Sequence, residues 1–153
     1  MQIRKAIDND VKFIIEMMAD DKLGHQREDF RIPLPEVYQE AFSKIDKDPN
    51  QELMVVEEGE KVIACFQLTF IQYLTYQGGI RAQIEGVRTH QDFRKKGIGK
   101  LMIEWAIERS REKGAHLLQL TTDKRRPEAL KFYESLGFKA THEGMKLHLK
   151  NIQ

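Results

Sequence analysis

The chain of 153 residues has a single cysteine, Cys65, which excludes an internal disulfide framework and any zinc site built from several cysteines. Cys65 lies in the apolar run 62–70, so we expect a buried, unreactive thiol. No stretch approaches the roughly 20 apolar residues of a membrane span. The first ten residues also lack the apolar segment of a secretory signal. We therefore expect a cytoplasmic protein that does not act on membranes.

The chain also has no excess of one charge. It carries 25 lysines and arginines and 24 acidic residues, which gives a net charge of +1. This balance argues against a nucleic-acid partner, because proteins that bind nucleic acids carry a strongly basic patch or face. Positive charge gathers instead in two short runs, 94–100 and 124–126. Such runs are either solvated surface or a local anion site. The five histidines show no spacing typical of metal ligands, so no metal is expected.

Apolar periodicity and turn residues predict one domain, 1–153, of the α/β (α+β) class. The predicted sheet is mixed, mostly antiparallel and six- to seven-stranded, with about four helices around it. A right-handed crossover makes its fourth and fifth strands parallel. Strands are expected at 3–7, 53–56, 62–74, 80–89 and 117–120, with two more within 138–149. Helices are expected at 8–18 (capped by Asp8), 36–45 (with Val37, Ala41 and Ile45 spaced four apart), 98–113 and 127–136.

A basic turn rich in glycine, residues 94–99 (RKKGIG), separates the fourth strand from the third helix. Backbone amides at the start of a helix, flanked by fixed positive charge, suit a diphosphate. Two familiar phosphate motifs do not fit: no GxxxxGK[ST] string exists, and Met102 occupies the third glycine position of GxGxxG. The turn alone is weak evidence, because many helices begin near glycine.

Residues 94–99 resemble the pyrophosphate loop (Gln/Arg-x-x-Gly-x-Gly/Ala) of the GNAT superfamily of acetyl-CoA-dependent N-acetyltransferases. Residues 129–138 (ALKFYESLGF) resemble the A-x-x-F-Y-x-x-L-G-F segment of the same family. The match is strong over 83–142 and absent from 20–49. The resemblance implies a GNAT-like sheet that splays between strands 4 and 5, with acetyl-CoA as the cosubstrate.

The resemblance and the physics of the loop assign the cofactor contacts. Gly86 is the expected place for a bulge that opens the sheet, although it could simply weaken the strand. Lys95 stands where relatives often have glycine. The predicted diphosphate contacts are Arg94, Lys95, Lys96, Gly97, Ile98, Gly99 and Lys100. Val87 and Thr89 are expected along the pantetheine arm, and Arg126 near the phosphates.

Two residues are candidates for the chemistry of amine acetylation. Glu85 is the expected general base, because it should face away from the core if Ile84 faces inward; a plain surface glutamate is the alternative, and His90 is another candidate base. Tyr133 matches the tyrosine near the CoA sulfur in relatives, although its helical position also fits half-buried packing.

The sequence therefore predicts an N-acetyltransferase that moves acetyl directly to a primary amine, since Cys65 offers no accessible nucleophile. A non-catalytic acyl-CoA-binding or sensing module is the alternative. The acceptor, a small molecule or a peptide, is left open, with a homodimer as one option for assembly.

Overall fold

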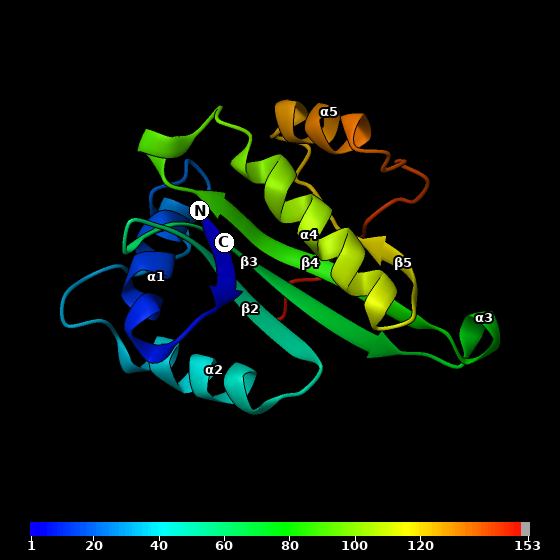
Figure 1. The fold of residues 1–153 in the computed structure, drawn as a ribbon, viewed down its shortest axis with the longest axis horizontal. Coiled ribbons are helices and arrows are strands. Elements are labelled where there is room, and N and C mark those ends of the chain that lie inside the picture. Colours follow the sequence, from blue (N-terminus) through cyan, green and yellow to red (C-terminus); the bar gives the residue numbers. More distant parts are fainter. Residues whose placement is uncertain (151–153) are drawn as a thin grey trace. The chain divides into compact units, whose positions relative to one another are not determined.

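The computed structural model describes residues 1–150, whose contacts divide the chain into two compact units, Met1–Gln119 and Leu120–Gln153. The first unit is an open sheet with helices, drawn from blue to yellow in Figure 1. The second contains one helix, α5 (Pro127–Ser135), followed by irregular chain to residue 150. The single domain over 1–153 stays a prediction.

The first unit carries all five strands of the described chain. Its elements are β1 (Gln2–Lys5), η1 (Asp8–Asp10), α1 (Val11–Ala19), η2 (Gly24–Gln26), α2 (Glu36–Lys47), β2 (Gln51–Glu58), β3 (Lys61–Gln72), α3 (Thr75–Gly78), β4 (Ile80–Thr89), η3 (Gln91–Phe93), α4 (Ile98–Glu112) and β5 (Ala115–Gln119). Here η denotes a short 3₁₀ turn. The Asp-Pro-Asn turn precedes β2, and glycine turns separate β2 from β3 and β3 from β4, close to where the sequence predicts.

The sheet has the order β1-β2-β3-β4-β5, antiparallel except for the parallel pair β4–β5. This confirms the mixed GNAT-like architecture, but the predicted count of six to seven strands is wrong. Residues 138–149 form no strand; Met145, Leu147 and Leu149 alternate as in a strand yet are almost fully exposed. A strand forms only by pairing its backbone, and no residue of 120–150 pairs in this way.

The predicted splay between the fourth and fifth strands is present. Pairing of β4 with β5 ends at Gln83 and Gln119, whereas β4 continues to Thr89. The β3–β4 register also shifts: Gln67 lies opposite Glu85, but Cys65 lies opposite Arg88. The extra residue coincides with Gly86, whose φ of +63° is costly for other residues. The predicted bulge is therefore confirmed. Over residues 84–89, the edge of β4 that faces β5 is not paired with β5.

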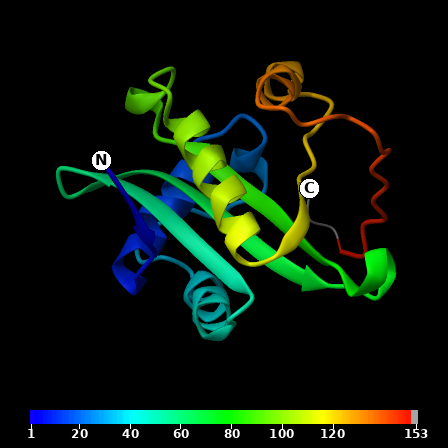
Figure 2. The same cartoon turned by 45° about the vertical axis from the view of Figure 1, so that its right-hand side comes forward.

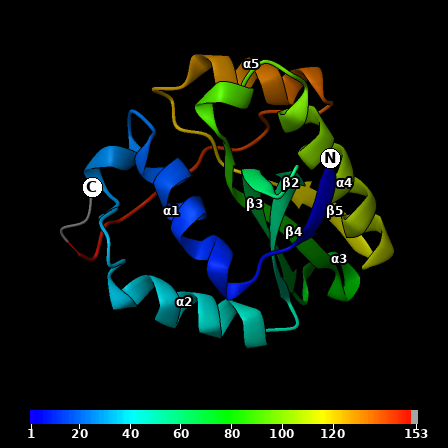
Figure 3. The same cartoon turned by 60° about the vertical axis from the view of Figure 1, so that its left-hand side comes forward.

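Two apolar layers flank the sheet of the first unit: α1 and α2 lie on one face and α4 on the other (Figure 3). Cys65 faces the first layer and is fully buried, and this burial raises the pKa of its thiol to about 12. Of the three apolar residues spaced four apart on α2, Val37 and Ala41 are exposed and only Ile45 packs against the core. Phe42 enters the core, with Tyr38 beside it.

The start of α1 depends on a buried ion pair rather than on Asp8, which was predicted to cap it and is exposed. Asp10 is 4% exposed; its carboxylate accepts two hydrogen bonds from Arg4 (2.7 and 3.0 Å) and one from the Ile7 N–H (2.8 Å). Arg4 also binds Glu57 on β2 at 2.7 Å. Burial alone would raise the pKa of Asp10, but the hydrogen bonds from Arg4 and Ile7 outweigh it and lower that pKa.

We expect Asp10→Asn to lower the free energy of unfolding by about 2 kcal/mol at pH 7, because Arg4 and Ile7 lose a charged acceptor. A lowered folded-state pKa stabilises above the unfolded value of about 3.9 and stops doing so as the pH falls through the folded value. The gap between wild type and variant should therefore close in urea titrations below about pH 4. Asp8→Asn is the matched control, and an equal loss in both variants would contradict the assignment.

Candidate functional site

The glycine turn before α4 presents three backbone N–H groups that have no hydrogen-bond partner within residues 1–150. Gly97 has φ of +80° and precedes Ile98, the first residue of α4. Leu101 N–H already binds the Gly97 carbonyl (3.1 Å), so the N–H groups of Ile98, Gly99 and Lys100 precede the intrahelical ladder. No acidic side chain lies in this first turn. The helix start thus offers amides and positive potential to an anion.

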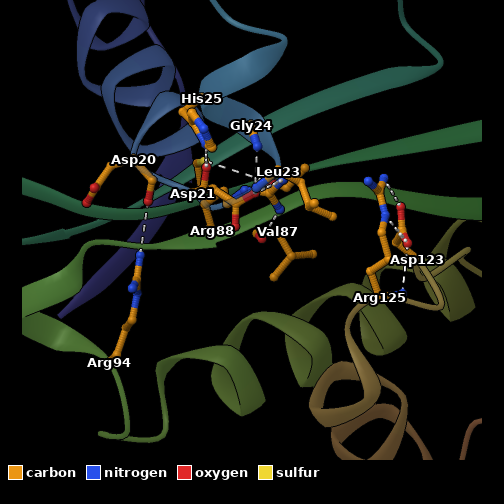
Figure 4. Close-up of polar contacts among 12 residues, drawn as sticks. Asp20, Asp21, Leu23, Gly24, His25, Val87, Arg88, Arg94, Asp123 and Arg125 are labelled. Carbon is orange, nitrogen blue, oxygen red and sulfur yellow. Dashed lines mark hydrogen bonds and ion pairs between the residues drawn. The ribbon is translucent and has the colours of Figure 1, made fainter. Parts of the chain in front are cut away.

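Arg94 anchors this loop to the rest of the first unit. Its Nε donates to the Thr89 carbonyl (3.2 Å), and its Nη2 donates to the Asp20 carbonyl beyond the end of α1 (3.3 Å; Figure 4). The side chain remains exposed. The guanidinium therefore has a positioning role that the motif alone did not suggest, in addition to its predicted contact with the diphosphate.

A further cation joins the loop from the β2–β3 hairpin. The Phe93 ring lies 5.2 Å from Lys96 Nζ and 5.3 Å from Lys61 Nζ. Sequence reasoning missed Lys61, because it lies 35 positions before Lys96 and only the strand pairing brings the hairpin here. Lys95 and Lys100 are exposed beside it. Four lysines therefore accompany the amides at the start of α4.

Lys95 adopts the left-handed conformation (φ +62°), which explains why a glycine would suit this position. We expect Lys95→Gly to raise the free energy of unfolding by about 0.5–1 kcal/mol, since the removed strain exceeds the added entropy of the unfolded chain. Urea denaturation measures this change. Lys96→Gly is the control: Lys96 has no positive φ, so glycine there should destabilise.

The end of β4 that pairs with β3 but not with β5 carries Val87 and Thr89, both half-buried. The Val87 carbonyl accepts a hydrogen bond from Arg88 Nη1 (2.8 Å; Figure 4), and the Thr89 carbonyl is the one held by Arg94. At Gly86, before them, an added Cβ would lie 3.1 Å from Met18 Cε of α1, so the methionine tip would have to shift slightly. The positive φ of Gly86 is the stronger reason for a glycine at this position.

Glu85 lies on the exposed side of β4, whereas its neighbour Ile84 is buried, as the alternation predicts. A chain of amides ends on its carboxylate: Gln119 Nε2 donates to Gln83 Oε1 (3.0 Å), and Gln83 Nε2 donates to Glu85 Oε1 (3.1 Å). These bonds orient the carboxylate and leave Oε2 without a hydrogen bond inside residues 1–150. Glu85 can therefore accept a proton from a bound water or an acceptor.

His90 is less suited to the role of base. Its Nδ1 accepts a hydrogen bond from the Asp92 N–H (3.2 Å) and so caps the η3 turn. A neutral imidazole has one acceptor nitrogen, so the other nitrogen, Nε2, then carries the hydrogen. The ring is occupied in holding the turn.

The second unit holds the other two predicted site residues. Tyr133 is half-buried on α5, with ring centroids 5.2 Å from Phe132 and 5.8 Å from Phe138, so it also has a packing role. Arg126 precedes Pro127, and its carbonyl accepts the Ala129 N–H (3.1 Å). Beside it, a two-point hydrogen bond from Arg125 lowers the pKa of Asp123.

Other features of the described chain lie apart from these residues. A cavity of about 660 Å³ borders Met54, Trp105 and Arg109, and no predicted site residue lines it. Within residues 1–150, no three His, Cys, Asp or Glu side chains gather closely enough to hold a metal ion. None of the helices there combines the length and the apolar character that crossing a membrane requires.

Comparison with known proteins agrees with this geometry. A crystal structure described as a transcriptional regulator from Bacillus halodurans C-125 is 55% identical, with a TM-score of 0.95 over 97% of this chain and 99% of that one. The aminoalkylphosphonate N-acetyltransferase of Salmonella typhimurium is 25% identical over 107 residues, 70% of this chain and 69% of that protein.

A predicted acetyltransferase from Clostridium acetobutylicum, solved with acetyl-CoA, shares the fold: its TM-score is 0.72 at 23% identity, over 97% of this chain and 96% of that one. The model of the acetyltransferase (GNAT) family matches residues 19–138, which include the whole loop, β4 and α5. The chain therefore belongs to the GNAT acetyltransferase family.

Proposed function

We propose that the chain is an acetyl-CoA-dependent N-acetyltransferase that moves the acetyl group directly to a primary amine. One observation carries the proposal: β4 runs six residues beyond its last pair with β5 and leads through the glycine turn into the bare N-terminus of α4. An extended arm with a diphosphate at one end suits an unpaired strand edge followed by free helix amides.

The residues of the first unit fit such a cosubstrate. The amides of Ile98, Gly99 and Lys100 would hold the diphosphate, with Gly97 allowing close approach and Lys95 and Lys96 adding charge. Val87 and Thr89 would lie along the pantetheine arm, whose far end brings the acetyl thioester. Arg126 is proposed near the phosphates on the family pattern alone.

The proposed chemistry assigns one proton to each catalytic residue. Glu85 accepts the proton of the ammonium through a water, so that the amine nitrogen can form a bond with the acetyl carbon. The bond between that carbon and sulfur then breaks, and Tyr133 donates its phenolic proton to the departing thiolate. The second proton that the amine nitrogen loses passes through solvent and restores the phenol of Tyr133. Cys65 is fully buried and cannot reach the thioester as a nucleophile, so the scheme includes no acyl-enzyme on this thiol.

The acceptor is proposed to be a small molecule. The Salmonella typhimurium relative is named for an aminoalkylphosphonate, and its similarity extends over 70% of this chain. Assembly as a homodimer and a place in the cytoplasm stay predictions.

A second candidate is a non-catalytic module that binds acyl-CoA and signals its presence. The Bacillus halodurans protein, 55% identical, is described as a transcriptional regulator, and this description favours such a role. The two candidates share the cofactor site and differ in whether an amine is acetylated.

Two measurements on the purified chain separate them. Calorimetry with CoA tests the cofactor site, and release of free thiol from acetyl-CoA, with a panel of primary amines, tests turnover. We expect binding and amine-dependent thiol release. Binding without release across the panel would favour the module, whereas the absence of binding would remove both candidates.

A further inference from the structure

Three polar side chains form a row on one face of β4. Arg81, Gln83 and Glu85 alternate with Ala82 and Ile84, which are 0% and 2% exposed on the opposite face. The bulge at Gly86 comes after the row and leaves its alternation intact. Successive members are two residues apart, so Arg81 and Glu85 are separated by about 13 Å along the strand. The Arg81 guanidinium and the carboxylate of Glu85, the proposed base, therefore lie on the same face of β4.

Arg81 lies against aromatic rings at the end of the β3–β4 hairpin, the long green ribbon in Figure 2. Its guanidinium carbon is 4.8 Å from the centroid of Tyr73 and 5.5 Å from that of Tyr76. Tyr76 in turn stacks on His116 of β5, with centroids 4.6 Å apart. The rings hold the guanidinium in place by cation–π contact, and their faces are only weak hydrogen-bond acceptors.

The charge of Arg81 has no counter-ion among the residues that the structure describes. It makes no ion pair there, and its Nε is buried without a hydrogen-bond partner. Arg88 also has a buried Nε without a hydrogen-bond partner, but its charge faces Asp21 at 3.9 Å. Arg4 binds Asp10 and Glu57, and Arg109 binds Glu52 at 2.6 Å. A buried, held N–H donor with no acceptor is uncommon and calls for an explanation. An anion that arrives with a ligand would satisfy it.

We propose that Arg81 binds the anionic group of the acceptor, so that the substrate is a small primary amine bearing a phosphonate, phosphate or carboxylate. The inference rests on the proposed function, because it uses Glu85 as the base for the amine. A planar guanidinium with adjacent N–H donors suits such anions in a two-point contact. The separation of about 13 Å leaves room for a short acceptor and one water next to Glu85.

Gln83 lies between Arg81 and Glu85 in this row. Both ends of its amide are already bound, to Gln119 and to Glu85. It therefore separates the cation from the carboxylate, so that they remain available to opposite charges of one zwitterionic acceptor. A purely structural Arg81, which only clamps the hairpin to β5, predicts no dependence on the charge of the acceptor.

The test compares acceptors of similar size that differ in charge. We would measure kcat and KM for 2-aminoethylphosphonate, β-alanine and the uncharged β-alaninamide with wild type, Arg81→Met, Arg81→Lys and the surface control Arg111→Gln. Dividing each anionic acceptor's kcat/KM by that of β-alaninamide, and comparing this ratio between variants, cancels the intrinsic reactivity of each amine. Arg81→Met keeps an apolar stem between the rings.

We expect Arg81→Met to lower the ratio about 10- to 100-fold for the anions, mainly through KM, as for a lost charged hydrogen bond. Arg81→Lys should lose less, and Arg111→Gln should match wild type. The inference would be overturned if Arg81→Met lost kcat/KM equally with all three acceptors, or if wild type had the same kcat/KM for the anionic and uncharged acceptors. Either result would leave the proposal of acetyl transfer intact.

Should no amine be acetylated, the enzyme proposal fails, and calorimetry decides the inference separately. Binding of 2-aminoethylphosphonate that weakens in Arg81→Met would still support the anion site. Equal or absent binding in both proteins would overturn it.

Discussion

Glu85→Gln is expected to lower kcat by about 10²- to 10⁴-fold, the usual contribution of one positioned general base. The amide has nearly the same shape and can still accept the hydrogen bond from Gln83 Nε2, so the strand should be undisturbed. What is lost is the ability to take a proton from the acceptor ammonium. The measurement is kcat for the best acceptor of the amine panel at saturating acetyl-CoA.

The control for this prediction is Glu58→Gln, an exposed glutamate at the end of β2. Both variants should bind CoA as tightly as wild type in calorimetry, because neither touches the loop. If Glu85→Gln keeps full activity, the base is another group. If it loses CoA binding as well, Glu85 has a structural role instead.

Tyr133→Phe is expected to reduce kcat about 10- to 100-fold, less than the loss of the base, because a thiolate is already a tolerable leaving group. The variant keeps the aromatic ring that contacts Phe132 and Phe138. Only the phenolic hydroxyl is removed. The measurement is kcat at saturating acetyl-CoA, together with thermal unfolding of the same protein.

Tyr133→Leu separates the two roles that Tyr133 combines. A packing role predicts that Phe preserves activity and stability while Leu lowers both. An acid role predicts that Phe already loses the activity although its melting temperature is unchanged. Equal activity of Tyr133→Phe and wild type would remove Tyr133 from the proposed mechanism.

Local signals in the sequence placed most elements accurately. Alternation from Ile80 to Thr89 and the change of period at Ile98 match β4 and the start of α4 to the residue. Gly86 and Gly97 marked the bulge and the helix start, because only a residue without Cβ adopts positive φ cheaply. The same reasoning failed for 138–149, where alternation is present but no described strand pairs with it.

The candidate site divides in a similar way. The loop and Glu85 were predictable, since a motif and a period of two are properties of adjacent residues. Lys61 beside Phe93 and the Asp20 carbonyl beside Arg94 were not, because each contact joins segments more than 30 residues apart. Their meeting depends on the register of β3 with β4 and on the packing of α1.

By itself, then, the sequence determined the order of helices and strands as far as α5 and the basic glycine turn, which follow from local backbone preferences and periodicity. The family was indicated by the resemblance of the two motifs at 94–99 and 129–138. Only the tertiary structure decided where β4 parts from β5, that Asp10 rather than Asp8 secures the first helix, and that Arg81 stands among aromatic rings without a counter-ion. These features arise from strand register and side-chain packing between distant segments, and no local pattern encodes such pairings.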